Sequence, residues 1–208
     1  MRPDAVPTRS RTQAEGSAAG VVIPIRSFTD AKARLADVLE PATRAEIAHR
    51  MADTVADAAA AMRVVVVSSA AEVEEWATDR GFEVISDPGS LDAAAVAGRE
   101  HLRAVGCHRA VIAHADLPHA RTLAPLARDG ARPIVALVPC HRDDGTNVLS
   151  VPVDVPFEFA YGPGSFRRHV AEAHRLGLGV RVVRAPDLAV DVDAPNDLHH
   201  VDLPVPLP

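Results

Sequence analysis

The chain has 208 residues, of which 48% are hydrophobic and 24% charged, and its formal net charge is −6. A chain of this length and composition can bury a core without a disulfide or a metal, so we expect a folded domain and not a disordered protein. The acidic balance and an aromatic content of 3% argue against a nucleic-acid-binding protein, which needs basic surface and stacking rings.

The distribution of apolar residues indicates the cellular location of the protein and the bounds of its folded domain. No apolar run approaches the roughly 20 residues of a membrane span, and the N-terminal stretch has no signal-peptide core. We therefore expect a cytoplasmic protein without a membrane partner. Residues 1–19 are predicted to be a disordered lead-in, 20–200 the folded domain and 201–208 an extended tail. Cys107 and Cys140 lack zinc-ligand spacing and are expected to be buried thiols.

Apolar runs and amphipathic stretches alternate along residues 20–200, which is typical of an α/β domain with a mainly parallel sheet. Such sheets bind ligands at the carboxyl ends of their strands, so candidate functional residues are sought there. The expected strands are 20–26, 63–69, 82–86, 110–114, 133–138, 148–151 and 180–184, and the expected helices are 41–62, 71–80, 93–105, 120–128, 166–176 and 195–200.

Two strand ends carry charged residues. Lys32 follows the first strand, where an ammonium can act as a point charge against nucleotide phosphates; the alternative is a solvated surface lysine. Asp116 follows the strand 110–114, and a carboxylate in that position suits Mg²⁺. His114 and His119 are poorer ligands for Mg²⁺, which prefers oxygen.

Asp191 and Asp193 point the same way from an extended segment. Two carboxylates so close repel each other unless a cation lies between them. The alternative is that one of them caps the helix that Pro195 opens.

The stretch Tyr161–Phe166 opens another helix and contains two glycines and Ser165. Backbone amides at such a helix start favour an anion. Arg167 and Arg168 oppose the helix dipole there, which a bound anion would explain, although both could simply be solvated. Asp92 either caps its helix or accepts hydrogen bonds from guanine.

Taken in order, these residues form a series that resembles the guanylyltransferases of coenzyme F-420 biosynthesis, which act on 2-phospho-L-lactate, phosphoenolpyruvate or 3-phospho-D-glycerate. The resemblance covers residues 20–200. It implies a single-domain nucleotidyltransferase of the GT-A type, with a Rossmann-like, mixed but mainly parallel sheet flanked by helices. The motifs are IPIR at 23–26, AKARL at 31–35, ADLP at 115–118, GTN at 145–147, YGPGS at 161–165 and DVDAPNDL at 191–198.

The resemblance also implies a reaction. GMP passes from GTP to the phosphate of a phosphorylated three-carbon acid, phosphoenolpyruvate being favoured, pyrophosphate is released, and the product is handed to the next transferase of the pathway. The implied roles are as follows: Lys32, Asp116 and Asp193 are catalytic; Asp116, Asp191 and Asp193 hold Mg²⁺; Thr146, Gly162 and Ser165 bind the acid; and Arg26 and Asp92 are further substrate-binding residues.

Three other functions fit parts of the pattern. Molybdenum-cofactor guanylyltransferases share the implied fold but have a glycine-rich first loop, which this chain lacks. A GT-A glycosyltransferase would also use an Asp-x-Asp pair. A non-catalytic nucleotide-binding regulator on the same fold is the third alternative.

Overall fold

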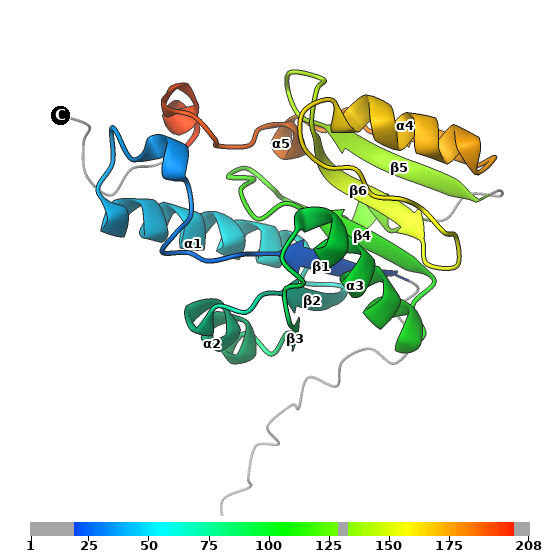
Figure 1. The fold of residues 1–208 in the computed structure, drawn as a ribbon, viewed down its shortest axis with the longest axis horizontal. Coiled ribbons are helices and arrows are strands. Elements are labelled where there is room, and N and C mark those ends of the chain that lie inside the picture. Colours follow the sequence, from blue (N-terminus) through cyan, green and yellow to red (C-terminus); the bar gives the residue numbers. More distant parts are fainter. Residues whose placement is uncertain (1–18, 129–132, 202–208) are drawn as a thin grey trace, which may run out of the picture.

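A computed structural model describes residues 19–128 and 133–201. Among these residues, seven strands form one sheet in the order β3-β2-β1-β4-β6-β5-β7 (Figure 1). Only β6 runs antiparallel to its neighbours β4 and β5 within that sheet, which confirms the expected mixed, mainly parallel sheet. The strands are β1 (Ala19–Pro24), β2 (Arg63–Val67), β3 (Glu83–Ile85), β4 (Arg109–Ala113), β5 (Ile134–Pro139), β6 (Thr146–Pro152) and β7 (Gly179–Val182).

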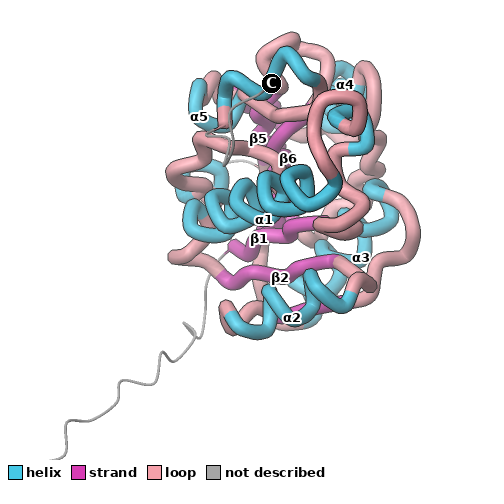
Figure 2. The backbone as a smooth tube through the Cα atoms, turned by 90° about the vertical axis from the view of Figure 1, so that its left-hand side faces the viewer, coloured by secondary structure: helices cyan, strands magenta, loops and turns pink. Residues whose placement is uncertain are grey.

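Helices cover both faces of the sheet (Figures 1 and 2). None of those in the described residues could cross a membrane. Residues 1–18 of the predicted lead-in 1–19 and residues 202–208 of the predicted tail 201–208 lie outside the described residues, whereas Ala19 belongs to β1 and not to the lead-in. The α-helices are α1 (Pro41–Ala58), α2 (Ala71–Asp79), α3 (Leu91–Ala104), α4 (Ser165–Arg175) and α5 (Pro186–Ala189), and the 3-10 helices are η1 (Ala33–Leu35), η2 (Ala124–Leu126) and η3 (Pro195–His200).

The core has two layers because alternate residues of each central strand face opposite sides of the sheet. In β1, Val21 and Ile23 pack with α1 and α2, whereas Val22 packs with α3. Helix α3 approaches β1 closely at Gly98, where a Cβ atom would lie 2.3 Å from a methyl group of Val22. These buried layers hold the carboxyl ends of β1 and β4 side by side.

The helix expected at 120–128 was wrong. The structure has only the 3-10 turn η2 in that region. Pro125 lacks an amide hydrogen and would break an α-helix at its centre. The Thr122 hydroxyl accepts the amide hydrogen of Ala124 at 3.2 Å, which favours a turn instead.

Both cysteines are buried free thiols, as expected. Burial raises the pKa of Cys107. Cys140 accepts a hydrogen bond from the Gly145 amide at 3.2 Å and so shapes the turn between β5 and β6. Cys140 therefore has a structural role in this turn.

Candidate active site

Three chain segments meet at the carboxyl edge of β1 and β4: the loop after β1, the loop after β4, and the segment between α5 and η3 (Figure 1). A small apolar cluster joins the first and third segments to α1. This cluster fixes the backbone that carries Lys32 relative to the backbone that carries Asp191 and Asp193. Its buried members are Leu35, Ile47, Met51, Val192 and Leu198.

Lys32 sits in this loop with left-handed backbone angles, φ 57° and ψ 42°. A non-glycine residue in this region is strained, and such strain is commonly retained for function. The loop is held on both sides: Arg44 of α1 donates to Ala31 O at 3.2 Å, and Glu72 of α2 accepts hydrogen bonds from Ser27 and the Phe28 amide. The strain at Lys32 is thus imposed by its neighbours.

The Lys32 ammonium lies between two of the predicted aspartates. Its Nζ atom is 2.6 Å from Asp116 Oδ2 and 3.3 Å from Asp193 Oδ1. Burial alone would lower the pKa of Lys32, but the two carboxylates raise it above its ordinary value of 10.5. Lys32 is therefore charged and buried, and the alternative of a solvated surface lysine was wrong.

Asp116 lies in the loop after β4, three residues beyond the end of the strand at Ala113. Burial would raise the pKa of its carboxyl group, but the nearby Lys32 charge holds it below the ordinary value of 3.8. One carboxylate oxygen accepts from Lys32, whereas Asp116 Oδ1 is buried and has no hydrogen-bond partner among the described residues. A buried carboxylate oxygen without a partner is energetically costly and favours a cation or a donor supplied by a ligand.

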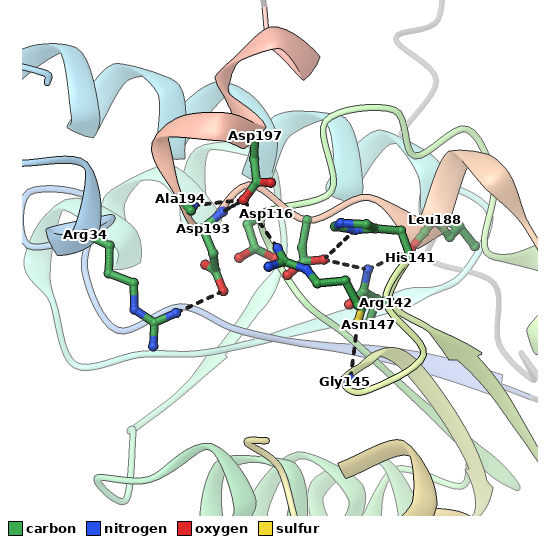
Figure 3. A network of polar contacts seen from close by, with 12 residues as sticks. Arg34, Asp116, His141, Arg142, Gly145, Asn147, Leu188, Asp193, Ala194 and Asp197 are labelled. Carbon is green, nitrogen blue, oxygen red and sulfur yellow. Dashed lines mark hydrogen bonds and ion pairs between the residues drawn. The ribbon is translucent and has the colours of Figure 1, made fainter. Parts of the chain in front are cut away.

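Asp191 and Asp193 flank Val192, whose amide donates to Asp116 O at 3.3 Å. Asp191 Oδ1 lies 3.5 Å from Asn147 Nδ2. Asp193 lies 3.9 Å from Arg34, and Figure 3 shows these two side chains pointing toward each other. Burial, and then the charges of Asp116 and Asp193, raise the pKa of Asp191. The three predicted carboxylates are thus brought together and repel one another.

Asp197 is a residue to which the sequence assigned no role. Its Oδ2 atom accepts the amide hydrogens of Asp193 at 3.0 Å and Ala194 at 2.8 Å (Figure 3). Burial raises its pKa, but these amides and Arg142 together lower it. Ala194 is the N-cap residue of η3, and Asp197 accepts its amide hydrogen from the first turn of the helix. Neither Asp191 nor Asp193 is the cap, so that alternative was wrong. The sequence signal that could have identified this role is the spacing of a capping box, in which a carboxylate stands three residues after the N-cap residue.

Replacing Asp197 with alanine should lower the free energy of unfolding by about 1 kcal/mol, because it removes the carboxylate that accepts two backbone amides at the start of η3. It should also lower activity, since the Asp193 backbone loses its anchor. Asp197→Asn keeps an oxygen acceptor and should therefore lose less stability and less activity than Asp197→Ala. Urea denaturation and turnover of the three proteins check this; equal stability of the alanine variant and the wild type would remove the capping role.

The carboxylates fit a hard divalent cation by their chemistry. All three offer oxygen, which Mg²⁺ prefers, and Asp116 Oδ1 is unpartnered in the described structure. Within residues 19–128 and 133–201, however, no three acidic, histidine or cysteine side chains already form a metal-binding group. Lys32 supplies the positive charge between Asp116 and Asp193 instead. A bound cation would therefore require Lys32 to exchange partners.

The predicted acid-binding residues form a second group beside the first. Ser165 Oγ lies 3.4 Å from Thr146 Oγ1, and both residues are only 1% exposed. Gly162 is exposed and adopts a φ of 97°, which favours glycine. The amides of Ser165 and Phe166 already donate to Gly162 O and Asp144 O, each at 3.0 Å. A ligand at this helix start would therefore depend on side-chain hydroxyls more than on these two amides.

Arg168 is exposed, as the solvated alternative expects, but its guanidinium is also held by the backbone of the preceding loop. Its guanidinium donates to the carbonyl oxygens of Ala160, Tyr161 and Pro163 at 2.5 to 3.2 Å. Arg168 thus closes the loop before α4, which explains a cation in the first turn of the helix. Arg167 is exposed.

Asp92 does not cap α3, because Ser90 accepts the Ala93 amide hydrogen and is the N-cap. Asp92 Oδ1 instead accepts the Tyr161 amide hydrogen at 2.7 Å. It therefore links the start of α3 to the loop before α4. Only its second oxygen is left for any contact with guanine.

Arg26 lines a separate cavity of about 220 Å³ between the ends of β1 and β2 and the start of α3. Its guanidinium donates to Gly89 O at 2.8 Å. Asp87 and Ser90 also line this cavity, and Asp92 does not. Asp87 Oδ1 accepts the Gly89 amide hydrogen at 2.8 Å, which leaves Oδ2 for other contacts.

Comparison with known proteins agrees with this geometry. The family described as "Guanylyl transferase CofC like" matches residues 19–203. A phosphoenolpyruvate guanylyltransferase from Sphaerobacter thermophilus is 35% identical over 86% of this chain and 90% of its own length. A 3-phospho-D-glycerate guanylyltransferase from Phenylobacterium zucineum is 32% identical over 86% of this chain and 87% of its own.

The fold is also found among solved structures. A nucleotide-diphospho-sugar transferase from Desulfovibrio desulfuricans superposes with a TM-score of 0.71 at 14% identity and covers 86% of this chain and 84% of its own. That likeness concerns the fold alone, whereas the sequence match extends over the whole described domain. The chain therefore belongs to the family of CofC-like guanylyl transferases, and it is a nucleotidyltransferase.

Proposed function

We propose that this enzyme transfers GMP from GTP to the phosphate of phosphoenolpyruvate and releases pyrophosphate. The observation that carries the proposal is the partly buried contact of Lys32 with Asp116 and Asp193 at the carboxyl edge of the sheet. The names of the relatives support the nucleotide and the acid. By its resemblance, the reaction belongs to coenzyme F-420 biosynthesis, where a following transferase would take up the product.

In this reaction a phosphate oxygen of the acid forms a bond to the α-phosphorus of GTP, and the bond from that phosphorus to the β-phosphate oxygen breaks. The attacking oxygen is already anionic, so no general base is needed. The residues of the chain instead orient the two substrates and offset their charge. Mg²⁺ held by Asp116, Asp191 and Asp193 would supply Lewis-acid stabilisation of the phosphate charge.

In this proposal Lys32 has one role in the free enzyme and another when GTP is bound. Without substrates it offsets the charge of Asp116 and Asp193. With GTP bound, its ammonium contacts the nucleotide phosphates and offsets their negative charge, as lysine does in other phosphate sites. The carboxylates that it leaves are then free for a cation. The fixed loop after β1 keeps Lys32 within reach of both partners.

The cavity beside Arg26 is the proposed site of the guanine base. Guanine presents two neighbouring N–H donors, which a carboxylate accepts, and a carbonyl oxygen, which a guanidinium can reach. Asp87 and Arg26, which both lie in the cavity wall, carry these two kinds of group. Asp92 lies outside that wall, so we assign base selection to Asp87.

We therefore expect the enzyme to prefer GTP strongly over ATP, since adenine would leave a carboxylate acceptor unpaired. Asp87→Asn should reduce the ratio of kcat/KM for GTP to that for ATP by about tenfold or more. Asp92→Asn is the matched control and should keep the ratio. Kinetics with both nucleotides check this; a reduced ratio in Asp92→Asn alone would assign guanine to Asp92.

The acid is tested by giving the enzyme GTP, Mg²⁺ and an equal mixture of phosphoenolpyruvate, 2-phospho-L-lactate and 3-phospho-D-glycerate. The three products differ in mass, so mass spectrometry of the mixture ranks the acids directly. We expect the phosphoenolpyruvate product to predominate. A predominant 3-phosphoglycerate product would instead align the chain with its Phenylobacterium zucineum relative.

A further inference from the structure

His169 is a buried histidine for which the sequence analysis found no role. It lies in α4 with 0% exposure. The Tyr161 ring stands edge-on to it at 4.9 Å between centroids, and the Phe157 ring is 5.9 Å away. Both of its ring nitrogens nevertheless have polar partners within 3.0 Å. A buried histidine with two such contacts is held in one orientation.

These contacts determine which ring nitrogen carries the hydrogen. The Ala160 amide donates to His169 Nε2 at 3.0 Å, and an amide nitrogen can only donate, so Nε2 is the acceptor. The hydrogen of the neutral ring is then on Nδ1, which lies 3.0 Å from Thr146 Oγ1. His169 therefore donates to Thr146.

The ring is neutral under physiological conditions. Burial first, and then the charges of Arg168 and His114, lower the pKa of His169 to about 4. A neutral ring keeps the same single donor over the whole range in which the enzyme would work. The direction of the hydrogen bond to Thr146 is thus fixed.

That direction leaves one hydroxyl hydrogen unused. Thr146 and Ser165 have two hydroxyl hydrogens, and the 3.4 Å contact between their oxygens needs only one of them. The other hydrogen has no acceptor among the side chains and backbone that the structure describes. An acceptor supplied by a ligand would satisfy it, and carboxylates and phosphates are the strongest such acceptors.

We propose that His169 is a positioning residue that makes the Thr146–Ser165 hydroxyl pair a hydrogen-bond donor to the anionic acid. This proposal rests on the proposed function, since it concerns the acid subsite of that reaction. Both hydroxyls are almost inaccessible, so their neighbours must give way slightly when the acid binds. A hydroxyl whose hydrogen is already oriented then needs no further rearrangement.

Two amide variants separate the contacts of the two ring nitrogens. In His169→Asn the side-chain nitrogen can stand near the position of Nδ1 and still donate to Thr146. In His169→Gln the side-chain oxygen can reach the position of Nε2 and accept from Ala160, whereas the donor to Thr146 is lost. His174→Gln, an exposed position on the same helix, is the control for the substitution itself.

The proposal predicts that His169→Gln raises the KM for the acid about tenfold, because an oriented hydrogen bond to a charged group is lost. The KM for GTP should change less than twofold. His169→Asn should recover most of the acid KM, and His174→Gln should match the wild type. An equal rise in the acid KM for both His169 variants, or a rise in the KM for GTP, would overturn the proposal.

A measurement that needs no turnover tests the same role. The imidazole ¹⁵N signals of His169 at pH 7 should show hydrogen on Nδ1 and none on Nε2; the opposite tautomer or a charged ring would overturn the proposal. If the tautomer is as expected but no acid promotes pyrophosphate release by the wild type, the proposed function fails, and the acid is overturned as the ligand of this hydroxyl pair.

Discussion

Replacing Asp116 with alanine should lower kcat by about 10³-fold or more, since several kcal/mol of charge stabilisation are lost with the carboxylate. The Asp116 side chain is 20% exposed at the carboxyl edge of the sheet, and its Oδ1 atom is buried without a partner in the described structure. The variant should still fold, because Asp116 follows β4 and does not belong to the strand itself. Steady-state turnover and circular dichroism measure the two effects.

Two further variants make this test specific. Asp193→Ala should cause a loss of similar size, because Asp193 shares Lys32 with Asp116. Asp154→Ala removes the same charge from an exposed turn beyond β6 and should leave kcat unchanged. Turnover of Asp116→Ala within tenfold of the wild type would remove Asp116 from the catalytic residues.

Replacing Lys32 with methionine should lower kcat/KM for GTP by about 10²- to 10³-fold, as the loss of one preorganised charge does in other enzymes. Arg34→Met makes the same charge change in the same loop. Arg34 is 80% exposed and lies 3.9 Å from Asp193, so its removal should cost less than tenfold. Equal losses in the two variants would indicate a general effect of positive charge and no specific role for Lys32.

The pairing of Lys32 also gives stability a definite pH dependence. The raised pKa of Lys32 means that its contribution is complete below 10.5 and is lost as the pH rises through the higher folded-state pKa. The lowered pKa of Asp116 means that its contribution is complete above 3.8 and is lost as the pH falls through the lower folded-state pKa. The difference in unfolding free energy between wild type and Lys32→Met should therefore be largest between these limits.

Lys32 offers an unusually direct probe, because it is the only lysine in the sequence. Labelling with [¹⁵N]lysine gives one Nζ signal. We expect this signal to shift when GTP and Mg²⁺ are added together, as the ammonium exchanges carboxylates for phosphates. A signal that does not respond to the nucleotide would place Lys32 outside the nucleotide site. Arginine supplies all the other residues among the 22 lysines and arginines, so the use of lysine at this one position is itself an indication of function.

The apolar runs were sufficient to predict the sheet. Buried β-branched strands such as Val64–Val67 have few other stable placements in a domain of this size, and parallel strands bring their carboxyl ends together. Lys32 and Asp116 could therefore be assigned to that edge because each follows a strand. Asp191 and Asp193 follow α5 and no strand, and only the family resemblance joined them to Asp116. The helix expected at 120–128 does not form because Pro125, at its centre, cannot donate a backbone hydrogen bond.

The contacts within the site could not be predicted in the same way. The left-handed backbone at Lys32 is imposed by tertiary contacts from Arg44 and Glu72, which lie far away in the sequence. Local propensity likewise could not distinguish Ser90 from Asp92 as the cap of α3, since both are good capping residues two positions apart. The partner of Asp92 is the backbone of Tyr161, 69 residues further along the chain.

The fate of GTP is the most direct test of nucleotidyl transfer at this site. Purified enzyme is given GTP, Mg²⁺ and phosphoenolpyruvate, and GTP, GDP, GMP, phosphate and pyrophosphate are quantified with and without the acid. We predict one pyrophosphate for each GTP consumed, only when the acid is present, and no release by Asp116→Ala above background. Formation of GDP and phosphate, or GTP consumption that is independent of the acid, would contradict guanylyl transfer to a phosphorylated acid.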